Sequence, residues 1–187
     1  MPRVYIGVGS NHQRAYNIQA AVRELGACFG ALTLSSVYES RAVGSAQGHF
    51  YNLVIGLNTT IPLAALRQRL HQIEQACGRV RGGTSGGRYP LDLDLLLYGD
   101  YVGPVNDRFV PRPDIEQYAF VLCPLAEIAG EARHPQRGER YRTLWQRFDK
   151  RRQPLRRVPL ALDDVAARPQ RAHPRRVGLT QVVGAAG

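Results

Sequence analysis

Two aspartates, Asp92 and Asp94, interrupt a leucine-rich run, RYPLDLDLLLYGD, at residues 88–100. Aspartate is a poor strand residue and is rarely buried without a partner. Residues two apart in a strand project from the same face, so the two carboxylates stand together while the neighbouring leucines point to the opposite layer. Adjacent carboxylates favour a bound cation, and their hard oxygens suit Mg²⁺. Two ion pairs to arginines on a half-exposed sheet face are the alternative interpretation.

An arginine- and glycine-rich segment, GRVRGGTSGGR, lies directly upstream at residues 78–88 and contains Arg79, Arg81 and Arg88. One guanidinium group can bind two phosphate oxygens at once. Glycines let a loop close over a ligand and reopen. By itself, such a segment is also typical of a solvated connection or a nucleic-acid contact. Beside a carboxylate pair on a strand, it predicts Mg²⁺-nucleotide phosphoryl transfer. The sequence has no GxxxxGK[ST] motif, which excludes a P-loop enzyme.

The hydrophobic pattern predicts the elements that must position these groups. Strands are expected at 3–9, 32–40, 49–59 and 91–98, and amphipathic helices at 15–29 and 60–78. This order of strand, helix, strand, strand, helix, strand predicts an α+β fold, the ferredoxin-like βαββαβ sandwich. Additional C-terminal short helices are expected within 108–129 and 140–148.

The distribution of positive charge distinguishes residues 1–150 from a more basic C-terminal segment. The chain has 187 residues and a net charge of +10, which favours a polyanionic partner. Many arginines follow Lys150 in a segment that is also rich in proline and alanine. We therefore expect one folded domain over residues 1–150 and a flexible basic tail over 151–187. Contact between this tail and nucleic acid is an open alternative, although the tail lacks aromatic residues to stack on bases.

The remaining composition indicates a cytoplasmic protein without a membrane partner. No apolar run approaches the roughly 20 residues that a membrane-spanning helix needs, and the first residues lack the pattern of a signal peptide. The spacing of the three cysteines does not match a metal-binding motif. We therefore expect free thiols in a reducing compartment.

Several motifs in fixed order give the sequence a family resemblance. YIGVGSN, SSVYES, FYNLVIGL, IEQACGRVR, LDLDLLLYGD and VPRPDIEQYAFVLCPLAEIAGE resemble segments of the 6-hydroxymethyl-7,8-dihydropterin pyrophosphokinases, and the similarity runs from about residue 3 to 150. The resemblance implies a ferredoxin-like fold and transfer of pyrophosphate from ATP, the co-substrate, to the hydroxymethyl group of the pterin in folate biosynthesis. It also implies two Mg²⁺ ions as cofactors.

The resemblance assigns roles to individual positions. Asp92 and Asp94 match the metal ligands, and Arg79 and Arg81 match the arginines of a catalytic loop. Glu74 matches a glutamate near the nucleotide. The pterin-binding positions are Ser40, Val43, Asn52, which reads the pterin edge, and Phe120, which stacks on its ring.

Three departures from the family pattern fall at the nucleotide side. Arg88 sits one residue earlier than the family's arginine, whose place is taken by Tyr89. Arg112 replaces a histidine, and Tyr118 replaces an arginine that meets the phosphates. We expect Arg88 and Arg112 to replace part of the lost charge, Arg88 as a catalytic residue and Arg112 as a nucleotide-binding residue. A non-catalytic or altered-specificity paralogue that binds pterin or nucleotide is the alternative.

Overall fold

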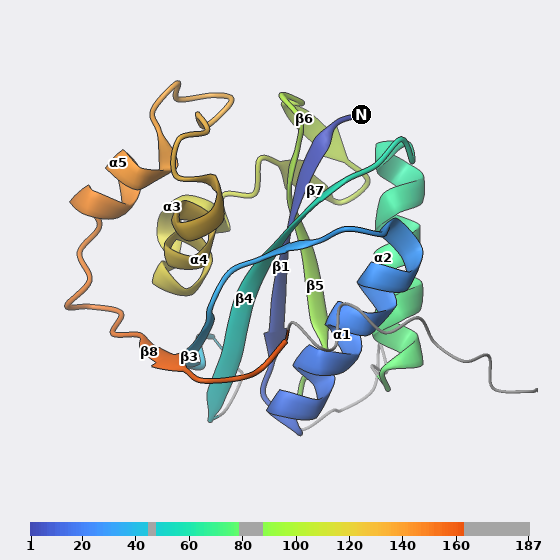
Figure 1. The fold of residues 1–187 in the computed structure, drawn as a ribbon. Helices are drawn as coiled ribbons and strands as arrows, with labels where there is room; N and C mark the ends of the chain where they lie inside the picture. Colours follow the sequence, from blue (N-terminus) through green and yellow to red (C-terminus); the bar gives the residue numbers. More distant parts are fainter. Residues whose placement is uncertain (45–47, 79–87, 163–187) are drawn as a thin grey trace, which may run out of the picture.

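The central sheet is built around β1 (Arg3–Ser10) in the computed structural model, which describes residues 1–44, 48–78 and 88–162 (Figure 1). Within these ranges the strand order is β5-β1-β4-β3-β8, with β2 paired to β4, and every pairing is antiparallel. The bounds of the other strands are β2 Thr33–Leu34, β3 Val37–Arg41, β4 His49–Asn58, β5 Asp92–Tyr98 and β8 Arg156–Val158. A separate hairpin of β6 (Gly103–Val105) and β7 (Arg108–Val110) follows β5.

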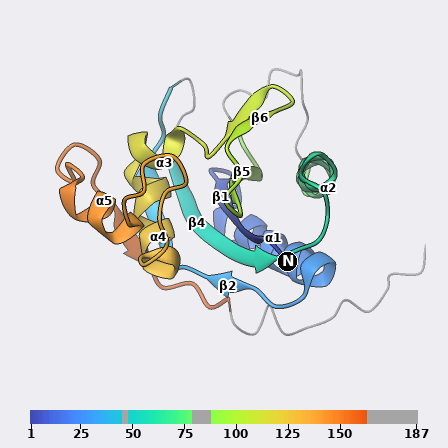
Figure 2. The ribbon, with the colours of Figure 1, turned by 90° about the horizontal axis from the view of Figure 1, so that it is seen from above.

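Helices cover both faces of this sheet (Figure 2). Their bounds are α1 Arg14–Phe29, α2 Leu63–Ala76, α3 Asp114–Gln117, α4 Ala119–Ala129 and α5 Tyr141–Arg147. The helices α1 and α2 bury one hydrophobic cluster against the sheet, to which Ile6 of β1 and Leu70 of α2 belong. The helices α3, α4 and α5 enclose a second cluster on the opposite face, to which Leu96 and Leu122 belong.

The observed topology confirms the predicted ferredoxin-like α+β fold. The elements β1, α1, β3, β4, α2 and β5 follow one another as predicted, and α3 to α5 are the additional helices. The expected strand at 32–40 is divided into β2 and β3 at two serines. At this break the hydroxyl of Ser35 accepts a hydrogen bond from the backbone N–H of Val54 at 2.9 Å, so a side chain replaces a strand carbonyl.

The two faces of β5 differ as its sequence predicts. Leu93 and Leu95 belong to the cluster under α1 and α2, whereas Leu96 belongs to the opposite cluster. Asp92 and Asp94 share the face of Leu96 because side chains alternate along the strand. Across the sheet, Asp92 pairs with Gly9 and Asp94 with Gly7, so no side chain of β1 stands beside the carboxylates.

The described structure continues beyond Lys150 into the segment expected to be a tail. Residues 156–158 form β8, where Val158 pairs with Val37 of β3. Arg156 contacts Glu39 of β3 at 2.9 Å, and Leu162 is only 6% exposed. The sequence predicts these arginines to be solvated, whereas Arg156 and Arg157 belong to an edge strand and Arg156 forms an ion pair with Glu39. Residues 163–187 of the expected tail lie outside the described residues.

No helix in the described parts of the chain is both long enough and apolar enough to cross a bilayer.

Candidate functional site

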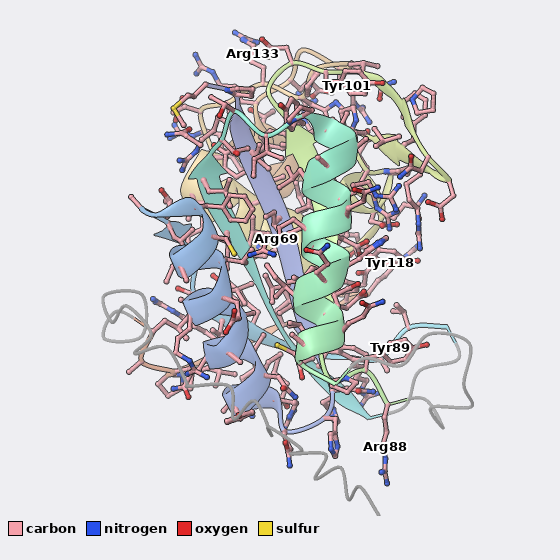
Figure 3. All side chains as sticks on the ribbon, turned by 90° about the vertical axis from the view of Figure 1, so that its right-hand side faces the viewer. Arg69, Arg88, Tyr89, Tyr101, Tyr118 and Arg133 are labelled. Atoms are coloured by element: carbon pink, nitrogen blue, oxygen red, sulfur yellow. The ribbon has the colours of Figure 1, made fainter. Side chains whose placement is uncertain are left out.

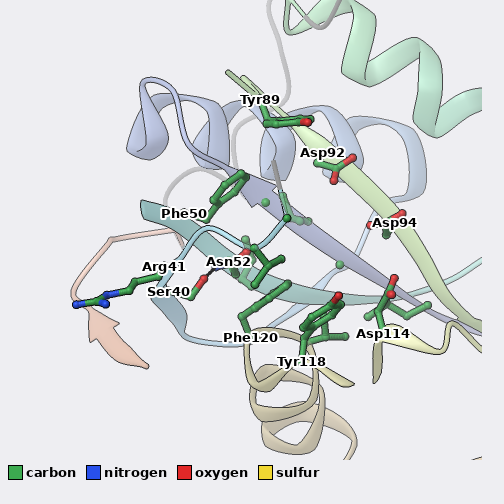
Figure 4. A pocket seen from close by; sticks show the side chains of 18 residues that line it. Ser40, Arg41, Phe50, Asn52, Tyr89, Asp92, Asp94, Asp114, Tyr118 and Phe120 are labelled. Carbon is green, nitrogen blue, oxygen red and sulfur yellow. Dashed lines mark hydrogen bonds between the residues drawn. The ribbon is translucent and has the colours of Figure 1, made fainter. Parts of the chain in front are cut away.

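A pocket of about 400 Å³, here named the aromatic pocket, opens between β1, β4, β5 and α4 (Figure 4). Its floor is formed by Gly7 and Gly9 of β1. A Cβ atom at Gly9 would lie 3.4 Å from Oδ1 of Asn52, and one at Gly7 would lie 3.4 Å from Leu96. The missing side chains of these two glycines therefore leave the space that a flat ligand needs.

The four residues predicted to bind the pterin all line the aromatic pocket: Ser40, Val43, Asn52 and Phe120. Asn52 is 5% exposed, and its Nδ2 donates a hydrogen bond to Oγ of Ser40 at 3.0 Å. This bond, between neighbouring strands β4 and β3, fixes the plane of the amide. The Oδ1 atom then lies on the side of Gly9, toward the pocket floor.

Aromatic rings stand at opposite sides of this pocket (Figure 4). Tyr118 and Phe120 stack with their ring centroids 5.0 Å apart and an interplanar angle of 15°. Phe50 and Tyr89 face each other with centroids 6.0 Å apart and an angle of 42°. Such a setting favours a planar, partly apolar ligand.

A second and narrower pocket, here named the arginine pocket, lies under α2 and the β6–β7 hairpin and holds about 40 Å³. Arg67, Arg108 and Arg112 line it. Glu74 is also part of its wall, so the two residues predicted to lie near the nucleotide, Glu74 and Arg112, are in one place. Asp92 and Asp94 line both pockets, which makes the carboxylate pair the boundary between them.

Asp94 has the strongest electrostatic perturbation at this boundary. Burial, together with the negative charge of Asp92, raises the pKa of Asp94 to about 6, although Arg112 opposes the rise. The Asp94 side chain nevertheless keeps 39% of its surface accessible toward the pockets. The surroundings of Asp94 therefore stabilise its negative charge incompletely, as expected of a cation-binding position.

Arg112 contributes an internal positive charge to the boundary. Its guanidinium lies 3.5 Å from Oδ1 of Asp94 and forms a closer ion pair with Asp114. Its side chain is 10% exposed. The predicted residue is thus present in the arginine pocket, but it already contacts one of the predicted metal ligands.

Arg88 lies apart from both pockets. Its side chain is exposed and points outward (Figure 3), and it is absent from the linings of the two pockets. The next residue, Tyr89, exchanges backbone and side-chain hydrogen bonds with Asn11 at 3.1 Å and 2.6 Å. These bonds turn Tyr89 into the aromatic pocket and leave Arg88 outside it. Arg79 and Arg81, the predicted catalytic arginines, lie outside the described residues.

Several lining residues carry no assigned role in the sequence interpretation. Gly7, Gly9, Phe50 and Asp114 line the aromatic pocket, and Arg67 lines the arginine pocket. A signal for the glycines was present, because two glycines at alternating positions in a strand remove side chains from one face only. Phe50, Asp114 and Arg67 have no comparable local signal.

Comparison with known proteins identifies relatives of the chain. The family model for 7,8-dihydro-6-hydroxymethylpterin-pyrophosphokinase (HPPK) matches residues 5–130. A protein of Synechocystis sp. named 2-amino-4-hydroxy-6-hydroxymethyldihydropteridine pyrophosphokinase is 36% identical over 147 residues, which cover 77% of this chain and 75% of the relative. A protein of Aquifex aeolicus with the same name is 35% identical over 137 residues, covering 72% and 85%.

Solved structures show the same fold. Plasmodium falciparum HPPK-DHPS, crystallised with SDX-DHP, superposes with a TM-score of 0.61 at 14% identity over 81% of this chain. This chain spans 44% of that longer protein. A second structure of HPPK-DHPS from the same organism, with pterin and p-hydroxybenzoate, gives a TM-score of 0.64 at 13% identity. The family match over residues 5–130, together with the two bacterial relatives, shows that the chain belongs to the 7,8-dihydro-6-hydroxymethylpterin-pyrophosphokinase family.

Proposed function

We propose that this protein transfers pyrophosphate from ATP to 6-hydroxymethyl-7,8-dihydropterin, a reaction of folate biosynthesis. The observation that carries the proposal is the position of Asp92 and Asp94, which line both the aromatic pocket and the arginine pocket. A reaction that joins a planar ring to a phosphate chain needs the two pockets to meet where carboxylates can hold a cation that neutralises the phosphates. The names of the bacterial relatives support the same activity.

The aromatic pocket is proposed to hold the pterin. Phe120 stacks on the ring, and Val43 covers it from the loop after β3. The amide of Asn52, fixed by its bond to Ser40, presents Oδ1 to an N–H group of the pterin edge. A buried amide that loses this partner would remain unpaired, and such a site rejects analogues that lack the N–H group.

The arginine pocket is proposed to contact the phosphate chain of the nucleotide, because its volume of about 40 Å³ is too small for the whole molecule. Arg112 offers guanidinium N–H groups to phosphate oxygens, and Glu74 lies in the same wall. Arg79, Arg81 and Arg88 are proposed to neutralise charge on the transferred group.

Mg²⁺ fits the carboxylate pair by the chemistry of its donors. Asp92 and Asp94 supply hard oxygens on one strand face, and the raised pKa of Asp94 indicates incompletely compensated negative charge. No group of three or more metal-binding side chains occurs in residues 1–44, 48–78 and 88–162. We propose that the cation is held by these one or two carboxylates together with substrate phosphates. Two Mg²⁺ ions held at Asp92 and Asp94 would neutralise phosphate charge and make the pterin hydroxyl more acidic.

The chain's own residues orient the reactants. The hydroxymethyl oxygen of the pterin forms a bond to the β-phosphorus of ATP, and the bond from that phosphorus to the α–β bridging oxygen breaks. AMP leaves, and the hydroxyl proton passes to solvent. Asn52 and Phe120 hold the hydroxymethyl group at the boundary, while Arg112 holds the phosphate chain in line with it. A misplacement of about 1 Å in this geometry costs on the order of 100-fold in rate.

AMP release from purified full-length protein supplied with the pterin and Mg-ATP tests this function. Asp92→Asn and Asp94→Asn are expected to lower the rate by about 100-fold or more. Arg147→Gln is the control, because Arg147 lies on α5, no residue of which lines either pocket. Pterin binding without AMP release over a long incubation would instead identify a non-catalytic binding protein.

A further inference from the structure

Arg112 is tied to β5 by its backbone as well as by its side chain. Its backbone N–H donates a hydrogen bond to the carbonyl of Leu96 at 3.0 Å, two residues beyond Asp94. Its guanidinium then lies between Asp94 and Asp114, with the closer contact to Asp114. A cation that belongs to the chain therefore lies at a carboxylate that the proposed function assigns to Mg²⁺.

The contact with Asp94 is loose. At 3.5 Å, the distance from Nη2 of Arg112 to Oδ1 of Asp94 exceeds that of a charge-assisted hydrogen bond. The Nε atom of Arg112 is buried and has no hydrogen-bond partner within the part of the chain that the structure describes. A buried donor without an acceptor is costly, so this side chain has unused capacity for an anionic ligand.

Asp114 provides an anchor that does not depend on Asp94. It lines the aromatic pocket at the boundary and starts α3, whereas Asp94 belongs to the sheet. A guanidinium that loses Asp94 keeps the ion pair with Asp114 and is not left as an isolated buried charge. The exchange of one partner is therefore possible without displacing the whole side chain.

We propose that Arg112 is an internal counter-cation of Asp94 that gives way to the divalent ion and turns its free N–H groups to the nucleotide phosphates. This inference rests on the proposed function. Arg112 and a divalent ion repel each other and compete for one carboxylate, so the metal alone binds weakly. Nucleotide phosphates supply the acceptors that Arg112 requires, so metal and nucleotide favour each other's binding.

Titration of the full-length protein with MnCl₂, with free Mn²⁺ measured by electron paramagnetic resonance, tests the competition without nucleotide. Arg112→Gln is expected to tighten Mn²⁺ binding by about tenfold, because it removes a positive charge a few ångströms away. Asp114→Asn is expected to weaken binding by about tenfold, because it releases the guanidinium onto Asp94 and removes a negative charge. Arg112→Lys retains the charge and should not tighten binding, and Arg147→Gln should leave it unchanged.

The double variant Arg112→Gln/Asp114→Asn distinguishes two effects of Asp114 on Mn²⁺ binding. One is the position that Asp114 gives to Arg112, and the other is the negative charge of Asp114 itself. In the Arg112→Gln background, Asp114→Asn should weaken Mn²⁺ binding by about threefold or less, since no guanidinium remains to be released. With a non-hydrolysable ATP analogue present, Arg112→Gln should lower nucleotide affinity by about tenfold while metal affinity rises. Unchanged or weaker Mn²⁺ binding in Arg112→Gln overturns the inference.

Two further outcomes keep the test decisive. If Arg112→Gln does not fold, Asp114→Asn carries the test, and Mn²⁺ affinity equal to that of the unmodified protein overturns the inference. If Asp92→Asn and Asp94→Asn leave Mn²⁺ binding unchanged, the metal assignment of the proposed function fails together with the inference. Loss of Mn²⁺ binding in those two variants, with no effect of Arg112→Gln, removes only the role given to Arg112.

Discussion

The carboxylate of Glu74 on α2 accepts a hydrogen bond from the backbone N–H of Leu93 on β5, at 2.9 Å. Leu93 stands between Asp92 and Asp94, and β5 is the edge strand of the sheet on this side. An unpaired edge N–H is a liability in a sheet, and here a buried side chain satisfies it. The helix α2 therefore fixes the segment of strand from which both aspartates project.

Replacement of Glu74 should expose the importance of this bond. Glu74→Ala is expected to lower the free energy of unfolding by about 3 kcal/mol, because it leaves a buried N–H without an acceptor and opens a cavity. Glu74→Gln keeps an acceptor oxygen and should cost about 1 kcal/mol. Urea denaturation of both variants measures the difference. Equal losses in the two variants would show that the hydrogen bond to Leu93 contributes nothing.

Tyr118 should support pterin binding through Phe120. The two rings stack in parallel, so Tyr118 limits the orientations of the ring that we propose to contact the pterin. Tyr118→Ala is expected to weaken pterin binding by about fivefold, and Tyr118→Phe, which keeps the ring, should change it by less than about twofold. Fluorescence titration with the hydroxymethylpterin measures both. A similar loss in Tyr118→Phe would instead assign the effect to the hydroxyl group.

Acid should destabilise the protein partly through His134. Burial lowers the pKa of His134 below its ordinary value, while the carboxylate of Glu116, 3.7 Å away, opposes the shift. The unfolded chain then binds a proton that the folded protein does not, so stability falls as pH drops through about 6.5 and stays higher above it. His134→Gln should reduce this dependence when urea unfolding is compared at about pH 7.5 and 5.5. Identical pH dependence in both proteins would exclude this contribution.

Removal of residues 151–187 should destabilise the domain, because it deletes β8 and the buried Leu162. We expect a loss of at least about 3 kcal/mol and association through the uncovered edge of β3. Leu162→Ala alone should cost about 2 kcal/mol. Thermal unfolding and size-exclusion chromatography measure the two effects. A truncated chain with the stability of the full chain would support the boundary at Lys150.

Local patterns were sufficient to predict the fold. The alternation in β5 placed its leucines and aspartates on opposite faces, and the three-to-four-residue recurrence in 15–29 predicted α1. Both signals depend on burial of one face, which a single segment records in its own sequence. The strand β8 was not predicted, because its sequence RRV has no such pattern. Its pairing depends on β3, which lies more than 100 residues earlier in the chain.

The family resemblance located the pocket residues but not their mutual contacts. It selected Asn52, Phe120 and Asp94, which all line the aromatic pocket, and it identified Arg112 as a departure. It did not predict the ion pair of Arg112 with Asp94, since this contact depends on the conformation of a long side chain after β7. The bond of Tyr89 to Asn11, which leaves Arg88 outside the pockets, likewise joins segments that no local pattern connects.

Gly9, which has no side chain at the floor of the aromatic pocket, affects the fold and ligand binding differently. An alanine at Gly9 would lie at ordinary contact distance from Asn52, so the empty protein should accommodate its methyl group. The same methyl group would occupy the volume that we propose for the pterin. A side chain at Gly9 would therefore be tolerated by the fold but not by the ligand that we propose, so this position constrains binding more than stability.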